Sequence, residues 1–155
     1  MGVMDKEEKR IAVFPGSFDP FTIGHKEILD RALPLFDKVI VLISCNSKKS
    51  RRTDIELTLI SIKNLYKDNP KVEVKINLES LTIDKCNMFG AKFIVRGLRN
   101  QNDFAYEQPI AQMNKEIGGV ETVFIASSPE LSNISSSIVK EYMKYGVDMS
   151  KYILK

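Results

Sequence analysis

The feature that most constrains the fold is the run Val39-Ile40-Val41-Leu42-Ile43, in which no position is polar. A strand with one face in solvent alternates apolar and polar residues, so a strand that is apolar throughout is covered on both faces. Sheets covered on both faces are mostly parallel, because the helices that connect parallel strands pack against them. The run therefore predicts a strand inside a parallel sheet with helices on both sides.

The rest of the chain repeats this alternation of strand and helix patterns. Short apolar runs at 11–14, 72–76, 93–95 and 123–126 predict four further strands. Helical spacing predicts helices at about 24–33, 53–66, 81–89, 102–117 and 135–145. The second helix opens with a capping box between Thr53 and Glu56, and the fourth contains Pro109.

Five strand–helix units with right-handed crossovers form a doubly wound, five-stranded parallel sheet, which is an α/β fold. We expect a single domain over 11–155 and a disordered N-terminal extension over 1–10. Ligands of such sheets bind at the carboxyl ends of the strands. The sequence after each predicted strand is therefore the place to look for a site.

Composition excludes several classes of protein. With two cysteines and a single histidine, the chain has neither a disulfide framework nor a His/Cys zinc site. No apolar stretch resembles a signal peptide or could span a bilayer, so we expect a cytoplasmic protein with no membrane partner. The net charge of +3 suits a small anionic ligand. The basic run at 48–52 has no interleaved aromatic residue, so we expect no nucleic-acid partner.

Candidate ligand-binding residues follow the first two strands. Ser17 lies in a loop rich in Pro and Gly, and His25 lies at the start of the next helix. Free backbone N–H groups at a helix start favour an anion, so this turn suits a phosphate group. The basic run at 48–52 follows the second strand, where a lysine can bind phosphate as a point charge.

Further candidates follow the last two strands. Arg96 and Arg99 flank Gly97 and offer bidentate recognition of phosphate oxygens. A row of serines at 135–137 opens the last helix, and Lys140 lies one turn further along and would add positive charge. These groups converge on one crevice. They favour the positioning and charge stabilisation of phosphates over covalent catalysis.

Each of these signals also has an ordinary structural explanation. His25 could form only a local hydrogen bond, and the basic run could be a solvated loop. The two arginines, Arg96 and Arg99, could be surface residues partnered by Asp103 and Glu107. The serines could do no more than cap a helix.

Several segments resemble a known family. Residues 14–20 with 22–25, 96–99 with 103–107, and 134–137 resemble the signatures of bacterial phosphopantetheine adenylyltransferases, within the nucleotidylyltransferase superfamily, over about 11–145. The resemblance implies a Rossmann-like nucleotidylyltransferase fold. It also implies reversible transfer of the adenylyl group of ATP to 4'-phosphopantetheine, giving 3'-dephospho-coenzyme A and pyrophosphate in coenzyme A biosynthesis. It further implies Mg²⁺ held mainly by substrate phosphates, a homohexamer, and coenzyme A as a candidate feedback inhibitor.

The same resemblance assigns roles to residues. Ser17, His25 and Lys48 would be catalytic, with Lys49 as the alternative to Lys48 because the preceding loop is short. The phosphopantetheine-binding residues would be Ser17, Lys48, Thr82 and Arg96. The ATP-binding residues would be Ser17, Phe18, His25, Gly97, Leu98, Arg99, Glu107, Leu131, Ser132, Asn133, Ile134, Ser135, Ser136 and Ser137. No residue is expected to bind a metal directly.

Two alternatives stay open. The chain could be another nucleotidylyltransferase that uses a different phosphate acceptor, such as nicotinamide mononucleotide or glycerol phosphate. The Arg96-Gly97-Leu98-Arg99 segment argues against that reading. It could also be a non-catalytic nucleotide-binding protein on the same fold. The presence of His25, Lys48 and Arg96 together argues against a mere binder.

Overall fold

The computed structural model describes residues 8–45 and 51–154, and its centre is a parallel sheet. The described part contains a five-stranded sheet in the order β3-β2-β1-β4-β5, with every neighbouring pair parallel. The strands are β1 (Ile11–Gly16), β2 (Lys38–Cys45), β3 (Val72–Leu78), β4 (Phe93–Leu98) and β5 (Glu121–Ala126). The predicted doubly wound α/β sheet is confirmed, with β1 in the middle.

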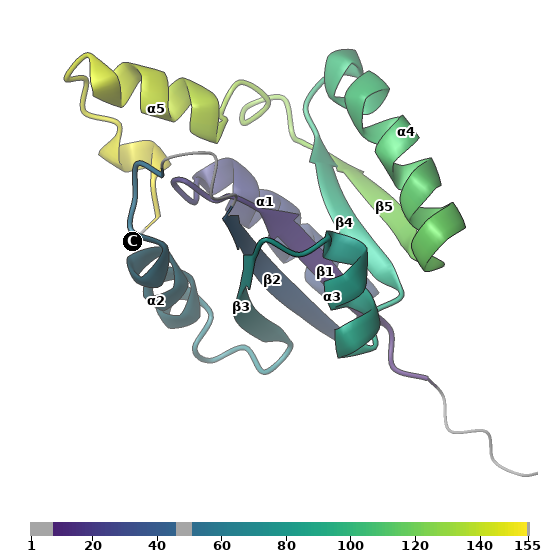
Figure 1. Cartoon of the computed structure of the whole chain (residues 1–155). Coiled ribbons are helices and arrows are strands. Elements are labelled where there is room, and N and C mark those ends of the chain that lie inside the picture. The colour runs from purple at the N-terminus through teal and green to yellow at the C-terminus, as the bar shows by residue number, and fades with distance from the viewer. Residues whose placement is uncertain (1–7, 46–50, 155) are drawn as a thin grey trace, which may run out of the picture.

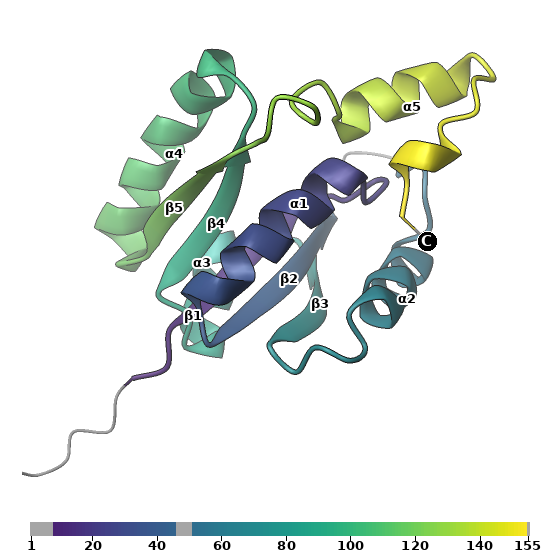
Figure 2. The same cartoon turned by 180° about the vertical axis from the view of Figure 1, so that it is seen from behind.

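Helices cover both faces of this sheet. They are α1 (Ile23–Ala32), α2 (Ile55–Leu65), α3 (Thr82–Phe89), α4 (Gln101–Gly118) and α5 (Ser136–Lys144), with short 3₁₀ turns at Leu33–Leu35 and Ser150–Tyr152. Figures 1 and 2 show α3 and α4 on one face and α1 on the other, while α5 lies beyond the carboxyl ends of the strands. No helix in the described ranges is both long and apolar enough to cross a bilayer.

The unbroken apolar run of β2 serves two separate core layers. Val39, Val41 and Ile43 pack with residues of α1 and α2. Ile40 and Leu42 point the other way and pack with residues of α3. Because successive side chains of a strand face opposite sides, burial on both faces requires an apolar residue at every position.

The start of α2 differs from the prediction. Asp54, and not Thr53, is the N-cap, and its carboxylate accepts a hydrogen bond from the N–H of Leu57 at 3.1 Å. The Thr53 hydroxyl instead donates to Asp19 at 2.7 Å. The predicted capping box between Thr53 and Glu56 is therefore wrong, because a buried carboxylate from the β1–α1 loop takes up the Thr53 side chain.

Both ends of the described chain contact the domain. Of the extension expected to be disordered over 1–10, residues 1–7 lie outside the described residues, and the N–H of Arg10 donates to Asp37 at 2.7 Å. Near the other end, Ile153 forms an antiparallel bridge with Thr22, and the N–H of Leu154 donates to the carbonyl of Phe21 at 3.1 Å. The C-terminal segment thus braces the loop that leads from β1 into α1.

Candidate active site

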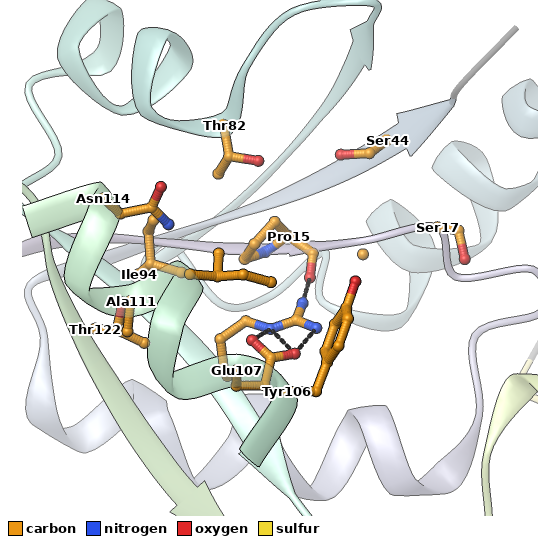
Figure 3. A pocket seen from close by; sticks show the side chains of 13 residues that line it. Pro15, Ser17, Ser44, Thr82, Ile94, Tyr106, Glu107, Ala111, Asn114 and Thr122 are labelled. Carbon is orange, nitrogen blue, oxygen red and sulfur yellow. Dashed lines mark hydrogen bonds and ion pairs between the residues drawn. The ribbon is translucent and has the colours of Figure 1, made fainter. Parts of the chain in front are cut away.

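Two adjoining cavities open at the carboxyl end of β1. The first, here called the helix-start cavity, lies against the first turns of α1 and α5 and includes His25, Arg99 and Ser136. The second, the α4 cavity, lies between α4 and the start of α3 and includes Thr82 and Asn114 (Figure 3). The residues common to both cavities are Pro15, Gly16, Ser17, Arg96 and Glu107.

An ion pair stands on the boundary between the two cavities. Arg96 donates to the Glu107 carboxylate through Nη2 at 2.5 Å and through Nε at 3.0 and 3.1 Å. Its Nη1 donates to the carbonyl of Pro15 at 2.8 Å, so the guanidinium is held against the end of β1 (Figure 3). Glu107 is only 8% exposed. The pairing of Arg96 with Glu107 therefore forms part of the site rather than a surface ion pair.

His25 acts in a helix cap and also lines the helix-start cavity. The backbone N–H of Thr22 donates to Nδ1 of His25 at 3.0 Å, and the N–H of His25 points at the Thr22 hydroxyl at 3.4 Å. In a neutral imidazole, one ring nitrogen accepts and the other carries the proton. With Nδ1 accepting, Nε2–H is the donor that the ring offers to the cavity.

The surroundings of His25 keep its ring neutral. Burial, together with the positive charges of Arg96 and Arg99, lowers the pKa of His25 from 6.5 to about 3. The Phe18 ring packs edge-on against the imidazole, with centroids 5.0 Å apart. Phe18 is only 2% exposed, so its ring supports His25 from within the core.

Two helix starts converge on the helix-start cavity. Gly24 lies in the first turn of α1, close enough to the chain before α5 that a Cβ would approach the Ile134 carbonyl to 3.3 Å. The Ser135 hydroxyl accepts from the N–H of Ile138 at 3.1 Å, and the Ser136 hydroxyl donates to the Pro20 carbonyl at 2.8 Å. The capping explanation therefore holds for Ser135, whereas the Ser136 hydroxyl fastens α5 to the β1–α1 loop. The first-turn backbone N–H groups that no cap side chain takes up have no acceptor within their own helices, an arrangement that favours an anion.

Arg99 lies on the same cavity and pairs with Asp103. Its Nε and Nη2 donate to the two carboxylate oxygens at 2.9 and 3.1 Å. This hydrogen bonding holds the pKa of Asp103 below its usual value. Arg99 therefore both pairs with Asp103 and lines the cavity. The arginine is oriented before any ligand arrives.

The structure brings most of the predicted residues together. The helix-start cavity includes the predicted ATP-binding residues Ser17, Phe18, His25, Gly97, Arg99, Glu107, Ile134, Ser135, Ser136 and Ser137. Ser17, Thr82 and Arg96, predicted to bind phosphopantetheine, line the α4 cavity. Leu98, Leu131, Ser132 and Asn133 are not among the residues that line either cavity. Lys48 and its alternative Lys49 lie outside the described residues.

One expected charge lies elsewhere. Lys140 does not line the helix-start cavity, because its ammonium pairs with the buried carboxylate of Asp19 at 3.1 Å. The prediction that Lys140 adds positive charge at the phosphate site is therefore wrong. Its charge is compensated by Asp19 in the β1–α1 loop.

The sequence prediction missed half of the α4 cavity. Its lining residues that were not predicted include Ser44, Ile94, Tyr106, Ile110, Ala111, Asn114 and Thr122. The available signal was the spacing along α4, because residues 107, 111 and 114 share one side of a helix. The Thr122 hydroxyl is buried and has no hydrogen-bond partner among the described residues.

The described residues do not fit a protein-bound metal. Across 8–45 and 51–154, no group of three or more His, Cys, Asp or Glu side chains is arranged to hold a metal ion. Two acidic residues line the cavities, Asp103 and Glu107, and each forms an ion pair with an arginine. A divalent cation at this site would rely on ligands other than these carboxylates.

Comparison with known proteins bears on this geometry. A family model described as cytidylyltransferase-like matches residues 13–142. The phosphopantetheine adenylyltransferase of Bacteroides thetaiotaomicron is 45% identical over 144 residues, covering 93% of this chain and 95% of that protein. The phosphopantetheine adenylyltransferase of Leuconostoc mesenteroides is 48% identical over 146 residues, covering 94% of this chain and 90% of that protein.

Solved structures agree on the fold. A putative nicotinate-nucleotide adenylyltransferase from Vibrio parahaemolyticus has a TM-score of 0.66 at 18% identity, covering 96% of this chain and 88% of that chain. A nicotinic acid mononucleotide adenylyltransferase from Plasmodium falciparum has a TM-score of 0.67 at 16% identity, covering 94% of this chain and 91% of that chain. At such identities the likeness establishes the nucleotidylyltransferase fold alone.

Proposed function

The chain belongs to the phosphopantetheine adenylyltransferase family of cytidylyltransferase-like proteins, and from this premise we propose that it transfers the adenylyl group of ATP to 4'-phosphopantetheine. A phosphate oxygen of the acceptor attacks the α-phosphorus of ATP. The bond from that phosphorus to the β-phosphate oxygen breaks, and pyrophosphate leaves with the bonding electrons. The products are 3'-dephospho-coenzyme A and pyrophosphate. The step is reversible, because one phosphoanhydride bond is exchanged for another.

The observation that carries this proposal is the pair of cavities with a common wall. ATP would occupy the helix-start cavity, where two helix starts and Arg99 face its phosphates. Phosphopantetheine would occupy the α4 cavity. The reacting phosphates would then meet at the shared residues Ser17 and Arg96. A binding protein for ATP alone has no need of a second cavity that adjoins the phosphates.

The chemistry of the site suits two anionic reactants. The attacking oxygen is already an anion, so no general base is required. The protein must hold two negative groups in line against their repulsion, and donors aimed at the developing charge lower that barrier. His25 would contribute Nε2–H as a neutral donor, and Arg96 would contribute its guanidinium. Ser17 and Lys48, or Lys49, complete the proposed set.

The lining of the α4 cavity favours phosphopantetheine over a nucleotide acceptor. It combines aliphatic side chains, Ile94 and Ile110, with the hydroxyl of Thr82 and the amide of Asn114. A pantetheine arm has the matching chemistry, since it carries methyl groups, methylenes, amides and a thiol. Coenzyme A combines that arm with an adenine nucleotide, so we also propose it as an inhibitor that occupies both cavities.

The proposal extends to metal, location and assembly. ATP would enter as its Mg²⁺ complex, with the ion held mainly by the phosphates and water. Cys45 and Cys86 are both unpaired, which supports a reducing cytoplasm. Tyr106, Ile110 and Met113 leave an apolar stripe exposed along α4, which supports a homo-oligomer, in our proposal a hexamer.

The deciding experiment is the release of pyrophosphate from Mg²⁺ and ATP with and without 4'-phosphopantetheine. We expect release that depends on this acceptor. Nicotinamide mononucleotide and glycerol phosphate serve as matched alternative acceptors. Release with either of these, and none with phosphopantetheine, would move the assignment to another transferase. Binding of ATP without release with any acceptor would indicate a non-catalytic protein.

A further inference from the structure

Asp19, in the loop between β1 and α1, is a junction of three chain segments. Its Oδ1 accepts from the backbone N–H and from the hydroxyl of Thr53, both at 2.7 Å. Its Oδ2 accepts from the N–H of Arg52 at 2.9 Å and from the ammonium of Lys140 at 3.1 Å. The side chain is 2% exposed, so these four donors replace water around a buried carboxylate.

The first segment leads from Asp19 back to the shared wall of the cavities. Arg51, next to the residues that Asp19 holds, donates through Nε to the Thr53 carbonyl at 3.2 Å. Its Nη1 donates to the Ser17 carbonyl at 2.6 Å. Ser17 lines both cavities. The carboxylate thus fixes the backbone on one side of the position where the two phosphates would meet.

The second segment leads from Asp19 to the start of α5. Lys140 lies one turn beyond Ser136, which lines the helix-start cavity. The Ser136 hydroxyl donates to the Pro20 carbonyl at 2.8 Å, immediately after Asp19 in the chain. The start of α5 is therefore fastened to the β1–α1 loop at two points, one neutral and one ionic.

The carboxylate is charged in the folded protein. Burial alone would raise its pKa, but the hydrogen bonds from Thr53, Arg52 and Lys140 outweigh burial and lower the pKa of Asp19 to about 2. A neutral group at this position would lose the pairing with Lys140 and could accept from fewer donors. Asp19 lines neither cavity, so any influence on the reaction passes through the segments that it holds.

We propose that Asp19 is a positioning residue for adenylyl transfer, which sets the Ser17 backbone and the start of α5 against the phosphates of ATP. The inference rests on the proposed function. Donors that are held in advance need no rearrangement when charge develops, and a displacement of about 1 Å lowers rates by about 100-fold. The buried junction supplies that rigidity from outside the cavities.

The test compares Asp19→Asn with Asp54→Asn. Both changes replace one carboxylate by an amide, but Asp54 only caps α2, where asparagine caps equally well. For Asp19→Asn we expect kcat to fall by about 10- to 100-fold. The KM for ATP should rise more than the KM for phosphopantetheine, because the start of α5 that Asp19 fastens lines only the helix-start cavity, whereas Ser17 lines both cavities. Kinetic constants equal to those of Asp54→Asn would overturn the proposal.

A second pair of variants tests the proposal if the Asp19→Asn protein folds poorly. Lys140→Met removes the ionic fastening of α5 at a partly exposed position, and Lys140→Arg restores a cation. We expect Lys140→Met to lower kcat and weaken ATP binding in calorimetry, and Lys140→Arg to recover most of both. Equal values for the two variants would overturn the inference. A wild-type protein that is inactive with every acceptor would instead reject the proposed function, and the ATP affinities would still decide the role of Asp19.

Discussion

The backbone N–H of Thr22 lies 3.0 Å from Nδ1 of His25, so one imidazole both caps α1 and offers Nε2–H to the helix-start cavity. The structural and the functional explanations of this histidine are therefore compatible, because each uses a different nitrogen of the same ring. The cap selects the tautomer, and the tautomer determines which nitrogen can donate to a phosphate.

Replacing His25 by alanine tests that arrangement. We expect kcat to fall by about 10²–10³, the usual effect of removing one donor from a developing charge. Stability should fall by only about 1 kcal/mol through the lost cap. Thr22→Ala is the matched control, because it removes the hydroxyl from the cap but keeps the backbone N–H that orients the ring. Equal losses of kcat in the two variants would make His25 a structural cap.

The protonation of His25 can be read from stability against pH. The folded protein holds its pKa near 3, below the usual 6.5, so between these values the unfolded chain binds a proton that the folded chain lacks. Stability from this group is complete above pH 6.5 and falls as the pH drops, by at most about 1.4 kcal/mol per unit.

The measurement is urea unfolding of the wild type and of His25→Gln at several values from about pH 4.5 to pH 8. The difference in unfolding free energy between the two proteins should be constant above pH 6.5 and should change with pH below that value. Asp19 does not interfere, because its contribution is lost as the pH falls from its ordinary pKa of 3.8 to its folded pKa of about 2, below this window, and is the same in both proteins. Parallel curves across the whole range would show that the pKa of His25 is the same in the folded and unfolded states, and would contradict a pKa near 3.

The assignment of one substrate to each cavity predicts a crossed kinetic pattern. Asn114 lines only the α4 cavity, and Arg99 lines only the helix-start cavity. Asn114→Ala should raise the KM for phosphopantetheine by about 5- to 10-fold, the worth of one hydrogen bond, and leave the KM for ATP unchanged. Arg99→Ala should do the reverse. Steady-state rates with each substrate varied in turn provide the check, and a common shift of both KM values in either variant would contradict the assignment.

The elements of the fold were predictable because burial on both faces of the sheet leaves an apolar signature in the strands themselves. The Arg96 and Arg99 positions were predictable for a similar reason, since Arg96 comes directly after the buried residues of β4 and Arg99 directly follows that strand. The contacts of Asp19 were not, because Thr53 is 34 and Lys140 is 121 residues away along the chain. Such long-range hydrogen bonds override local capping preferences and leave no periodic signal. For the same reason, Thr53 was predicted to pair with Glu56, and Lys140 was predicted to face phosphates, whereas both bind Asp19.

The glycine between the two arginines gives the last prediction. A Cβ on Gly97 would lie 2.8 Å from Cγ1 of Ile28, so α1 packs directly on β4 at this point. Gly97→Ala should therefore lower the unfolding free energy by about 1–3 kcal/mol through overpacking. Ile28→Ala alone should lower it by about 2–5 kcal/mol, because it opens a cavity where the buried Ile28 packs between α1 and β4.

The two changes should compensate each other in the double variant, since the alanine methyl at 97 would occupy part of the space that Ile28 leaves. Chemical denaturation of the wild type, both single variants and the double variant forms a complete cycle. We expect the loss in the double variant to be smaller than the sum of the single losses by at least about 1 kcal/mol. Strict additivity would mean that the glycine serves the approach of a ligand to the backbone of β4, and not the packing of α1.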